Sequence, residues 1–306
     1  MNMHKHACIL LAVTILGCSN TETPQQRAIP EVYTTFYPTT YFAQRIAGDL
    51  VKIICPLPAD KDPITWMPNT ATIAAYQQAD LILVNGADFD RWVDKVSLPP
   101  SKLIDTACPL AGTFVGFDTS ITHSHGPGGQ HDHAGIDGHT WLDPHNAKIQ
   151  AAEVHKALVR LLPSRIDKLR ANHTALAEDL DAIDASLATL SEKLKDQGLL
   201  AAHPAYNYLV RRYEWNLTNL DLDPEVTPSN ELIADIRKQV EQIRPRPQII
   251  LWEQQPVDTV SEQLKKDLGL VSVVFSPCEH RPNQPHDYLS VMRANVSRLQ
   301  AALSTE

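Results

Sequence analysis

One stripe of apolar residues near the middle of the chain constrains the fold more than any other feature. Its members are spaced by 7, 4, 3, 4, 3 and 4 residues, as on one face of an α-helix: Leu169, Leu176, Leu180, Ile183, Leu187, Leu190 and Leu194. The pattern predicts a linking helix over residues 164–197, with Gly198 as its C-terminal stop. At ~1.5 Å per residue, it would be long enough to run the length of a two-lobed protein. A coiled-coil dimer is the alternative, but only about four heptads are available, so we expect a rigid strut within a monomer.

Short β-rich runs alternate with amphipathic stretches on both sides of this helix. We expect strands over 32–36, 51–54, 81–84, 199–202, 217–222, 248–252 and 271–275, and helices over 41–48, 70–79, 230–243 and 288–303. Continuous apolar runs such as Leu81–Val84 are typical of parallel strands buried on both faces. The predicted fold class is therefore α/β: two helix-covered, mostly parallel-sheet lobes, residues 29–163 and 198–306, joined by one long rigid helix.

Composition excludes several classes of protein. The chain has 306 residues, of which 43% are hydrophobic and 21% are charged, and this suits two lobes that each bury a core. Lys and Arg number 27 against 36 Asp and Glu, and the resulting net charge of -9 argues against a nucleic-acid partner. No segment beyond residue 17 offers about 18 uninterrupted apolar residues, so we expect no membrane span in the mature chain.

The N-terminus has the features of a bacterial export signal. A short basic start over residues 4–6 precedes the apolar stretch 7–16, and Ile15-Leu16-Gly17-Cys18 resembles a lipobox. We expect a signal peptide over 1–17, lipidation of Cys18 and a polar tether over 18–28, so that the lipid alone anchors the protein at the periplasmic face of a bacterial membrane. A plain secretory signal is the alternative. Three cysteines then remain, as one disulfide with one buried thiol or as three buried thiols: Cys55, Cys108 and Cys278.

Histidine is concentrated between residues 123 and 139. Two H-x-H pairs flank a bend rich in Gly and Pro: His123, His125, His131 and His133. Imidazole nitrogen suits Zn, Cu and Ni far better than Mg or Ca, so this loop is predicted to collect a metal, with a merely solvated loop as the alternative. His139 precedes an ordered-looking turn, and His203 ends an apolar run in the second half. Because α/β folds place their sites at the carboxyl ends of strands, we expect one ligand from each lobe there.

Three segments of the chain resemble the zinc- and manganese-binding solute-binding lipoproteins of bacterial metal ABC importers. Residues 79–86 (ADLILVNG), followed by Trp92, are similar to the family's A-D-L-hydrophobic-N-G segment. Residues 139–144 (HTWLDP) match H-x-W-L-D-P, and residues 203–208 (HPAYNY) match H-P-A-[FY]-x-Y. The resemblance covers nearly all of the mature chain. It implies two α/β lobes joined by one long helix and a metal between them on four ligands, with His139 and His203 as the second and third.

The first and last ligand positions depart from the family pattern. The motif D-P-H-x-[YFW]-E-P appears as residues 62–68 (DPITWMP), with Ile64 in place of the first His, and Phe275-Ser276-Pro277 stands where the family often has hydrophobic-D-P. Three explanations are open: the His-rich loop supplies imidazoles, a carboxylate enters the site, or tight binding has been lost. The candidate donors are Asp62, Glu253 and Glu279, with Cys278 and His280 as softer ones. We favour the loop, with Glu253 holding a ligand imidazole by its other nitrogen.

The patterns together predict capture of a divalent transition metal outside the cytoplasm and its delivery to an ABC permease, with no reaction catalysed. Two or more imidazoles favour Zn²⁺ over Mn²⁺, and the general order of affinities also admits Cu²⁺. A periplasmic zinc buffer or an adhesin-like lipoprotein is the alternative that the missing first His keeps open. A metal-dependent hydrolase with Glu253 as its base is a remote alternative, because the sequence has no H-E-x-x-H segment or nucleophile elbow.

Overall fold

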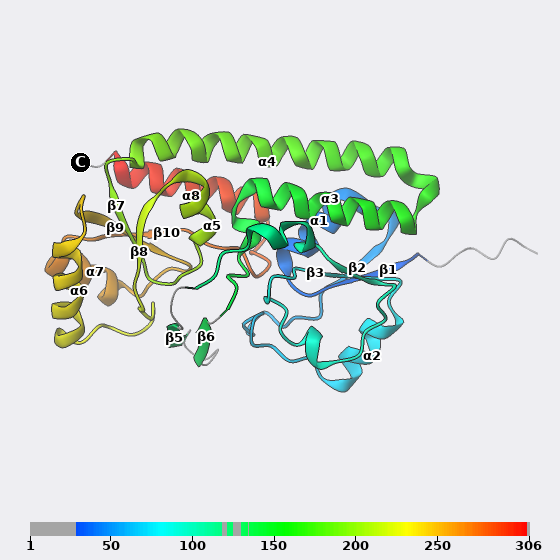
Figure 1. Cartoon of the computed structure of the whole chain (residues 1–306), viewed down its shortest axis with the longest axis horizontal. Helices are drawn as coiled ribbons and strands as arrows, with labels where there is room; N and C mark the ends of the chain where they lie inside the picture. The colour runs from blue at the N-terminus through cyan, green and yellow to red at the C-terminus, as the bar shows by residue number, and fades with distance from the viewer. Residues whose placement is uncertain (1–28, 118–120, 125–129, 134, 305–306) are drawn as a thin grey trace, which may run out of the picture.

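Two four-stranded sheets lie toward opposite ends of an elongated molecule, and one long helix runs alongside both (Figure 1). The computed structural model describes residues 29–117, 121–124, 130–133 and 135–304, and for 121–124 and 130–133 it describes the backbone only. All strand pairs in both large sheets are parallel. The predicted fold class is confirmed.

The N-terminal sheet has the strand order β2-β1-β3-β4. Its strands are β1 (Glu31–Thr34), β2 (Lys52–Ile54), β3 (Leu81–Val84) and β4 (Leu103–Asp105). Alternate residues point to opposite faces: Val32 and Leu83 join the core beneath α1 (Tyr37–Ala47) and α3 (Pro144–Leu161), whereas Tyr33 and Ile82 face Tyr76 of α2 (Thr70–Gln78). Strand β3 is therefore buried on both sides, as its continuous apolar run predicts.

The C-terminal sheet repeats this arrangement with the order β10-β9-β7-β8. Its strands are β7 (Gly198–Ala201), β8 (Asn216–Asn219), β9 (Pro247–Trp252) and β10 (Val271–Val274). One face packs on α8 (Tyr288–Leu303), and the other packs on α6 (Asn230–Gln242) and α7 (Asp258–Leu268). Ser229 caps α6 by accepting a hydrogen bond from the Leu232 backbone N–H at 3.2 Å.

The linking helix α4 spans Ile166–Leu194, and a 3₁₀ turn over Pro163–Arg165 precedes it. All seven residues of the apolar stripe are at most 2% exposed, and they belong to one core that includes residues of both sheets. Helix α4 packs on α1 and α3 in the N-terminal half and on α8 in the C-terminal half (Figure 1). Because the two lobes share a close-packed core along this strut, large hinge movements between them would break packing.

Two short antiparallel strands, β5 (Ile121–Ser124) and β6 (Gln130–His133), contain His123, His131 and His133 of the His-rich segment. Their register places the backbone of His123 opposite that of His131, while His125 lies outside the described residues. The predicted signal peptide, Cys18 and the tether also lie outside them. The three remaining cysteines are free thiols, and Cys108 is exposed rather than buried. Among the helices of the described part of the chain, none has the length and apolarity that a bilayer span requires.

Candidate metal centre

Three ionisable side chains of the C-terminal lobe follow the carboxyl ends of its strands. His203 comes two residues after β7, Glu253 directly follows β9, and Glu279 lies in the loop between β10 and α8. Because β7, β9 and β10 are parallel neighbours in one sheet, their carboxyl ends share one edge. The topology thus gathers the three residues at a single cleft, as is usual for sites of α/β proteins.

His139 comes from the N-terminal lobe, at the start of a 3₁₀ turn over Thr140–Leu142. The preceding Gly138 lies so close to Phe89 that an added Cβ would approach the Phe89 Cβ to 2.8 Å, so this segment needs a glycine. Asn85, which follows β3, donates from Nδ2 to the Gly138 carbonyl at 2.9 Å. Gln150 of α3 donates to the Asn85 side-chain oxygen, also at 2.9 Å. Buried amides therefore fix the backbone that carries His139.

The four side chains converge in pairs. The His139 Nε2 lies 3.0 Å from the Glu279 Oε1, and the His203 Nε2 lies 3.2 Å from the Glu253 Oε1. The ring centroids of the two histidines are 6.0 Å apart. One ligand atom each from His139, His203 and Glu253 lie within 4.8 Å of one another. Imidazole nitrogens and carboxylate oxygens at this separation match the donors of a four-coordinate zinc site.

Burial and close negative charges perturb the pKa values of this cluster. Burial disfavours the charged form of His139, but the Asp137 and Glu279 carboxylates outweigh it and hold the pKa of the imidazole well above its usual value. Burial, followed by the charge of Glu279, raises the pKa of Glu253 well above the ordinary range of a carboxyl group. The metal-free cluster thus holds its protons more firmly than isolated His and Glu side chains do. A dication that binds here displaces them and neutralises the repulsion between the carboxylates.

Asp137 is a functional candidate that the sequence analysis missed. It is fully buried, and its Oδ1 accepts from the His139 Nδ1 at 2.7 Å and from the His139 backbone N–H at 2.9 Å. A carboxylate behind a ligand histidine fixes the tautomer that leaves Nε2 available to a metal. The spacing D-x-H in Asp137-Gly138-His139 is the sequence signal that points to it.

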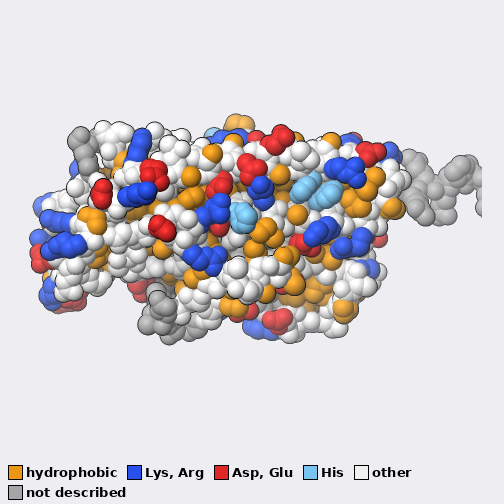
Figure 2. All heavy atoms as spheres, turned by 45° about the horizontal axis from the view of Figure 1, so that its top comes forward, with side chains coloured by type: hydrophobic (Ala, Val, Ile, Leu, Met, Phe, Trp, Pro, Cys, Tyr) orange, Lys and Arg blue, Asp and Glu red, His pale blue; other side chains and the backbone are white. Residues whose placement is uncertain are grey.

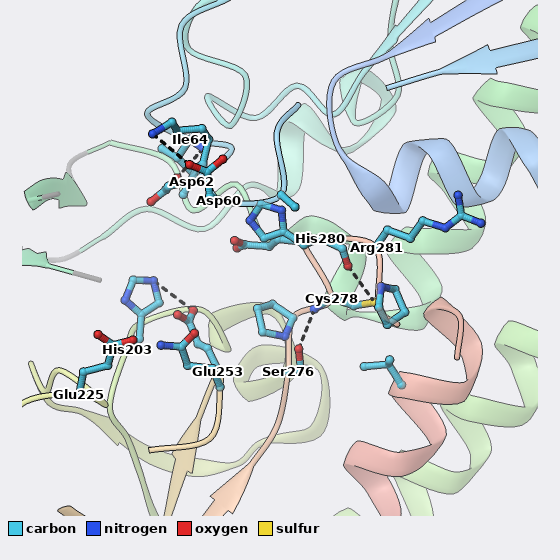
Figure 3. A pocket seen from close by; sticks show the side chains of 17 residues that line it. Asp60, Asp62, Ile64, His203, Glu225, Glu253, Ser276, Cys278, His280 and Arg281 are labelled. Carbon is cyan, nitrogen blue, oxygen red and sulfur yellow. Dashed lines mark hydrogen bonds and ion pairs between the residues drawn. The ribbon is translucent and has the colours of Figure 1, made fainter. Parts of the chain in front are cut away.

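The turn that contains Asp62 and Ile64, where the family motif has its first ligand histidine, lies across the cleft from His203 and Glu253 (Figure 3). Together they line a cavity of about 550 Å³. Ile64 is in the wall and offers no donor, while the Asp62 Oδ1 accepts from the Ile64 backbone N–H at 2.7 Å and so shapes the turn.

Ser276, Cys278 and His280 also line this cavity. Burial raises the pKa of the Cys278 thiol to about 12, so it is not a ready thiolate donor.

The protein has two α/β lobes, a rigid linking helix and a His/His/carboxylate cluster in the interlobe cleft. These features together are typical of a metal-binding solute-binding protein. The family model described as "ZnuA: Zinc-uptake complex component A periplasmic" matches residues 32–302. The chain belongs to this family, and its members are binding proteins rather than enzymes.

Individual relatives agree with this assignment. The chain is 25% identical over 306 residues to the zinc-binding lipoprotein AdcA of Streptococcus pneumoniae, an alignment that covers 97% of this chain and 60% of the relative. It is 23% identical to the high-affinity zinc uptake system protein ZnuA of Bacillus subtilis, over 97% of this chain and 95% of the relative. The chain therefore spans about three-fifths of the first relative's length and nearly all of the second's.

The fold is shared with solved structures of the family. The Zn(II)-bound ZnuA-like domain of Streptococcus pneumoniae AdcA superimposes with a TM-score of 0.75 over 91% of this chain and 99% of that domain, at 24% identity. The Bacillus subtilis metal-dependent lipoprotein YcdH gives a TM-score of 0.74 over 90% of this chain and 98% of that protein, at 21% identity. At this level of identity the likeness concerns the fold.

Proposed function

We propose that this protein captures Zn²⁺ outside the cytoplasm and delivers it to the ABC permease of a metal importer. The observation that carries the proposal is the convergence of two buried histidines, His139 and His203, with Glu253 in the interlobe cleft, where Glu279 is bonded to His139. Membership of a zinc-uptake family and the zinc-binding names of its relatives support it.

The ligand set that we propose is His139 Nε2, His203 Nε2 and one oxygen each from Glu253 and Glu279. Each carboxylate already lies near hydrogen-bond distance of one ligand imidazole, so small side-chain shifts suffice to enclose an ion. The set compensates for Ile64 with carboxylates, and it needs no imidazole from the His-rich hairpin. Asp62 is set apart from it, because its Oδ1 holds the turn that contains Ile64.

Two imidazoles with two carboxylates favour Zn²⁺, since imidazole binds zinc well and the tetrahedral arrangement is the one zinc prefers. The oxygen donors also suit Mn²⁺, and affinity order alone admits Cu²⁺, so selectivity is part of the test.

Delivery requires that the protein stay near its permease. We propose that lipidation at Cys18 and the tether 18–28 hold the folded domain at the periplasmic face of the membrane as a monomer, with the membrane contacted only through the lipid. Relatives named as lipoproteins support this arrangement.

A calorimetric titration of the soluble domain from residue 29 onward, first with ZnCl₂ and then with MnCl₂, tests the proposed function. We expect a single site with submicromolar affinity for zinc and weaker binding of manganese. If neither metal binds more tightly than tens of micromolar, capture for import is wrong and a zinc buffer or adhesin becomes the better interpretation.

Carboxylate variants test the proposed ligands. Glu253→Gln and Glu279→Gln each keep the size of the side chain but weaken a charged oxygen donor, and we expect each to lower zinc affinity by about 10-fold or more. Glu225→Gln is the matched control, because Glu225 lines the same cavity but is exposed at its rim. Equal effects of all three would show that general negative charge, rather than coordination, attracts the ion.

A further inference from the structure

Hydrogen bonds that cross from one lobe to the other join the backs of the two histidine-bearing segments. Behind His139, the Asp137 Oδ1 accepts a hydrogen bond from the His139 Nδ1, and the Asp137 Oδ2 accepts one from the Asn207 Nδ2 at 3.0 Å. Asn207 begins α5 (Asn207–Tyr213) of the C-terminal lobe, four residues after His203. A single carboxylate thus bonds the ligand of one lobe and the segment that follows the ligand of the other.

Tyr208 adds a second crossing bond at the same point. Its hydroxyl donates to the Asp137 backbone carbonyl at 2.7 Å and accepts from the Val115 backbone N–H at 3.3 Å. Asp137 in turn donates its backbone N–H to the Val115 carbonyl at 2.8 Å. The phenol of the C-terminal lobe is therefore inserted between two segments of the N-terminal lobe, and both Asp137 and Tyr208 are fully buried.

The direction in which His139 points depends on this arrangement. The ring is held by the Asp137 Oδ1 on one side, and the backbone and Oδ2 of Asp137 are held by Tyr208 and Asn207. Buried hydrogen bonds in a low dielectric are strong and costly to break. With Nδ1 committed to Asp137, the imidazole can present only Nε2 to an ion.

We propose that Asn207 and Tyr208 are positioning residues of the metal centre: by holding Asp137 from the opposite lobe, they orient His139 toward His203 before the ion arrives. The inference rests on the proposed function, since it concerns the same metal. It adds to the proposed ligands two residues that hydrogen-bond to Asp137 and do not themselves coordinate the ion. Metal affinity and the fit between the lobes are then coupled through Asp137.

The test compares Asn207→Ala and Tyr208→Phe with Tyr41→Phe in the soluble domain. Tyr41 is the matched control, because its hydroxyl also forms an interlobe bond, to the Asp287 Oδ2 at 3.2 Å, but lies on α1 and not behind a ligand. Zinc affinity is measured by competition with a chromophoric chelator. The His139 imidazole is followed in the metal-free protein by ¹⁵N NMR, which reports the hydrogen-bonded Nδ1 proton, and circular dichroism confirms folding.

We expect Asn207→Ala and Tyr208→Phe to weaken zinc binding by about 10- to 100-fold and to shift the His139 ring signals. Tyr41→Phe should change zinc affinity by no more than about threefold and leave the ring signals where they are. The proposal is overturned if the first two variants bind zinc like the wild type, if their ring signals are unchanged, or if Tyr41→Phe weakens binding equally. A wild-type protein that fails to bind zinc would instead overturn the proposed function, and this failure would be visible before any substitution is made.

Discussion

The two lobes share an architecture but contribute unequally to the candidate metal centre. In the C-terminal lobe, His203, Glu253 and Glu279 all lie in loops that follow the carboxyl ends of neighbouring strands. In the N-terminal lobe the loop after β2 offers Ile64. Among the side chains described for that lobe, only His139 adds an imidazole to the cluster, and it comes from a segment far beyond β4. The C-terminal lobe therefore holds most of the donors that we propose.

The difference between the lobes shows that sheet topology determines which loops reach the cleft, whereas the side chain at each loop position determines whether that position can bind a metal. Both lobes direct a loop into the cleft, and Ile64 lines the cavity opposite His203. On the outer face that includes α3 and α4, basic and acidic side chains are interspersed (Figure 2). The wall of the interlobe cavity carries more acidic side chains, among them Asp62, Glu253 and Glu279, than basic ones, which are Lys61 and Arg281.

Removal of either imidazole should have the largest effect and should be similar for the two lobes. We expect His139→Ala and His203→Ala each to lower zinc affinity by more than about 100-fold, because each removes a nitrogen donor from a four-donor site. Calorimetry of the soluble domain measures this. A loss confined to His203→Ala would show that His139 is not a ligand.

Conversion of Ile64 to histidine should reduce the asymmetry between the lobes. Because Ile64 is only 8% exposed and lines the cleft, Ile64→His adds an imidazole on the wall that lacks a donor. We expect zinc affinity to rise by about 10-fold and the preference for zinc over manganese to increase. Ile64→Leu is the control of similar volume. A gain in both variants would point to packing rather than coordination.

Deletion of the hairpin, residues 123–133, should have a small effect if carboxylates replace the first histidine. We expect the zinc affinity of the interlobe site to change by no more than about threefold, although additional weak sites should disappear from the titration. A collapse of submicromolar binding would show that imidazoles of the hairpin complete the site, as the sequence analysis favoured.

A buried carboxylate of the N-terminal lobe outside the cluster should affect stability but not metal binding. Burial raises the pKa of Asp90 to about 6, while its Oδ2 accepts from the Gly86 backbone N–H at 2.9 Å. Between about pH 4 and 6 the folded protein retains a proton that the unfolded chain has released, so the contribution of Asp90 to the free energy of unfolding falls as pH rises, by up to about 1.4 kcal/mol per pH unit.

Asp90→Asn should remove this dependence, so the stability of the variant relative to wild type should rise from pH 4 to 6 and level off above. Urea unfolding at several pH values measures the difference, and zinc affinity should be unchanged. A stability difference independent of pH would contradict the raised pKa of Asp90.

Much of the fold could be predicted from local pattern. The stripe from Leu169 to Leu194 encodes α4 because its period matches a helix, and the run Leu81–Val84 encodes β3 because a strand buried on both faces needs no polar alternation. Helix α3 was not predicted, although Asp143 caps it and Pro144 begins it, because its apolar positions are diluted by alanine and charged residues. Helix α7 was missed for a related reason: only Val260, Leu264 and Leu268 mark its buried face.

The candidate site could be predicted only in part. His139 and His203 stand out by motif, and Glu253 and Glu279 could be named as candidates, but their pairing depends on how the lobes pack. Glu253 lies beside the His203 Nε2 within the cluster, so it is placed as a candidate ligand and not only as a support. The bond from Asn207 to Asp137 joins residues 70 positions apart across the cleft, and no local pattern encodes it.

The most direct measurement is a crystal structure of the zinc-loaded soluble domain, with the anomalous signal collected at the zinc edge. We expect one strong peak in the interlobe cleft, bounded by the Nε2 atoms of His139 and His203 and by oxygens of Glu253 and Glu279 at about 2.0–2.2 Å. A peak coordinated by histidines of the 123–133 hairpin, or one that lacks both glutamates, would contradict the proposed site.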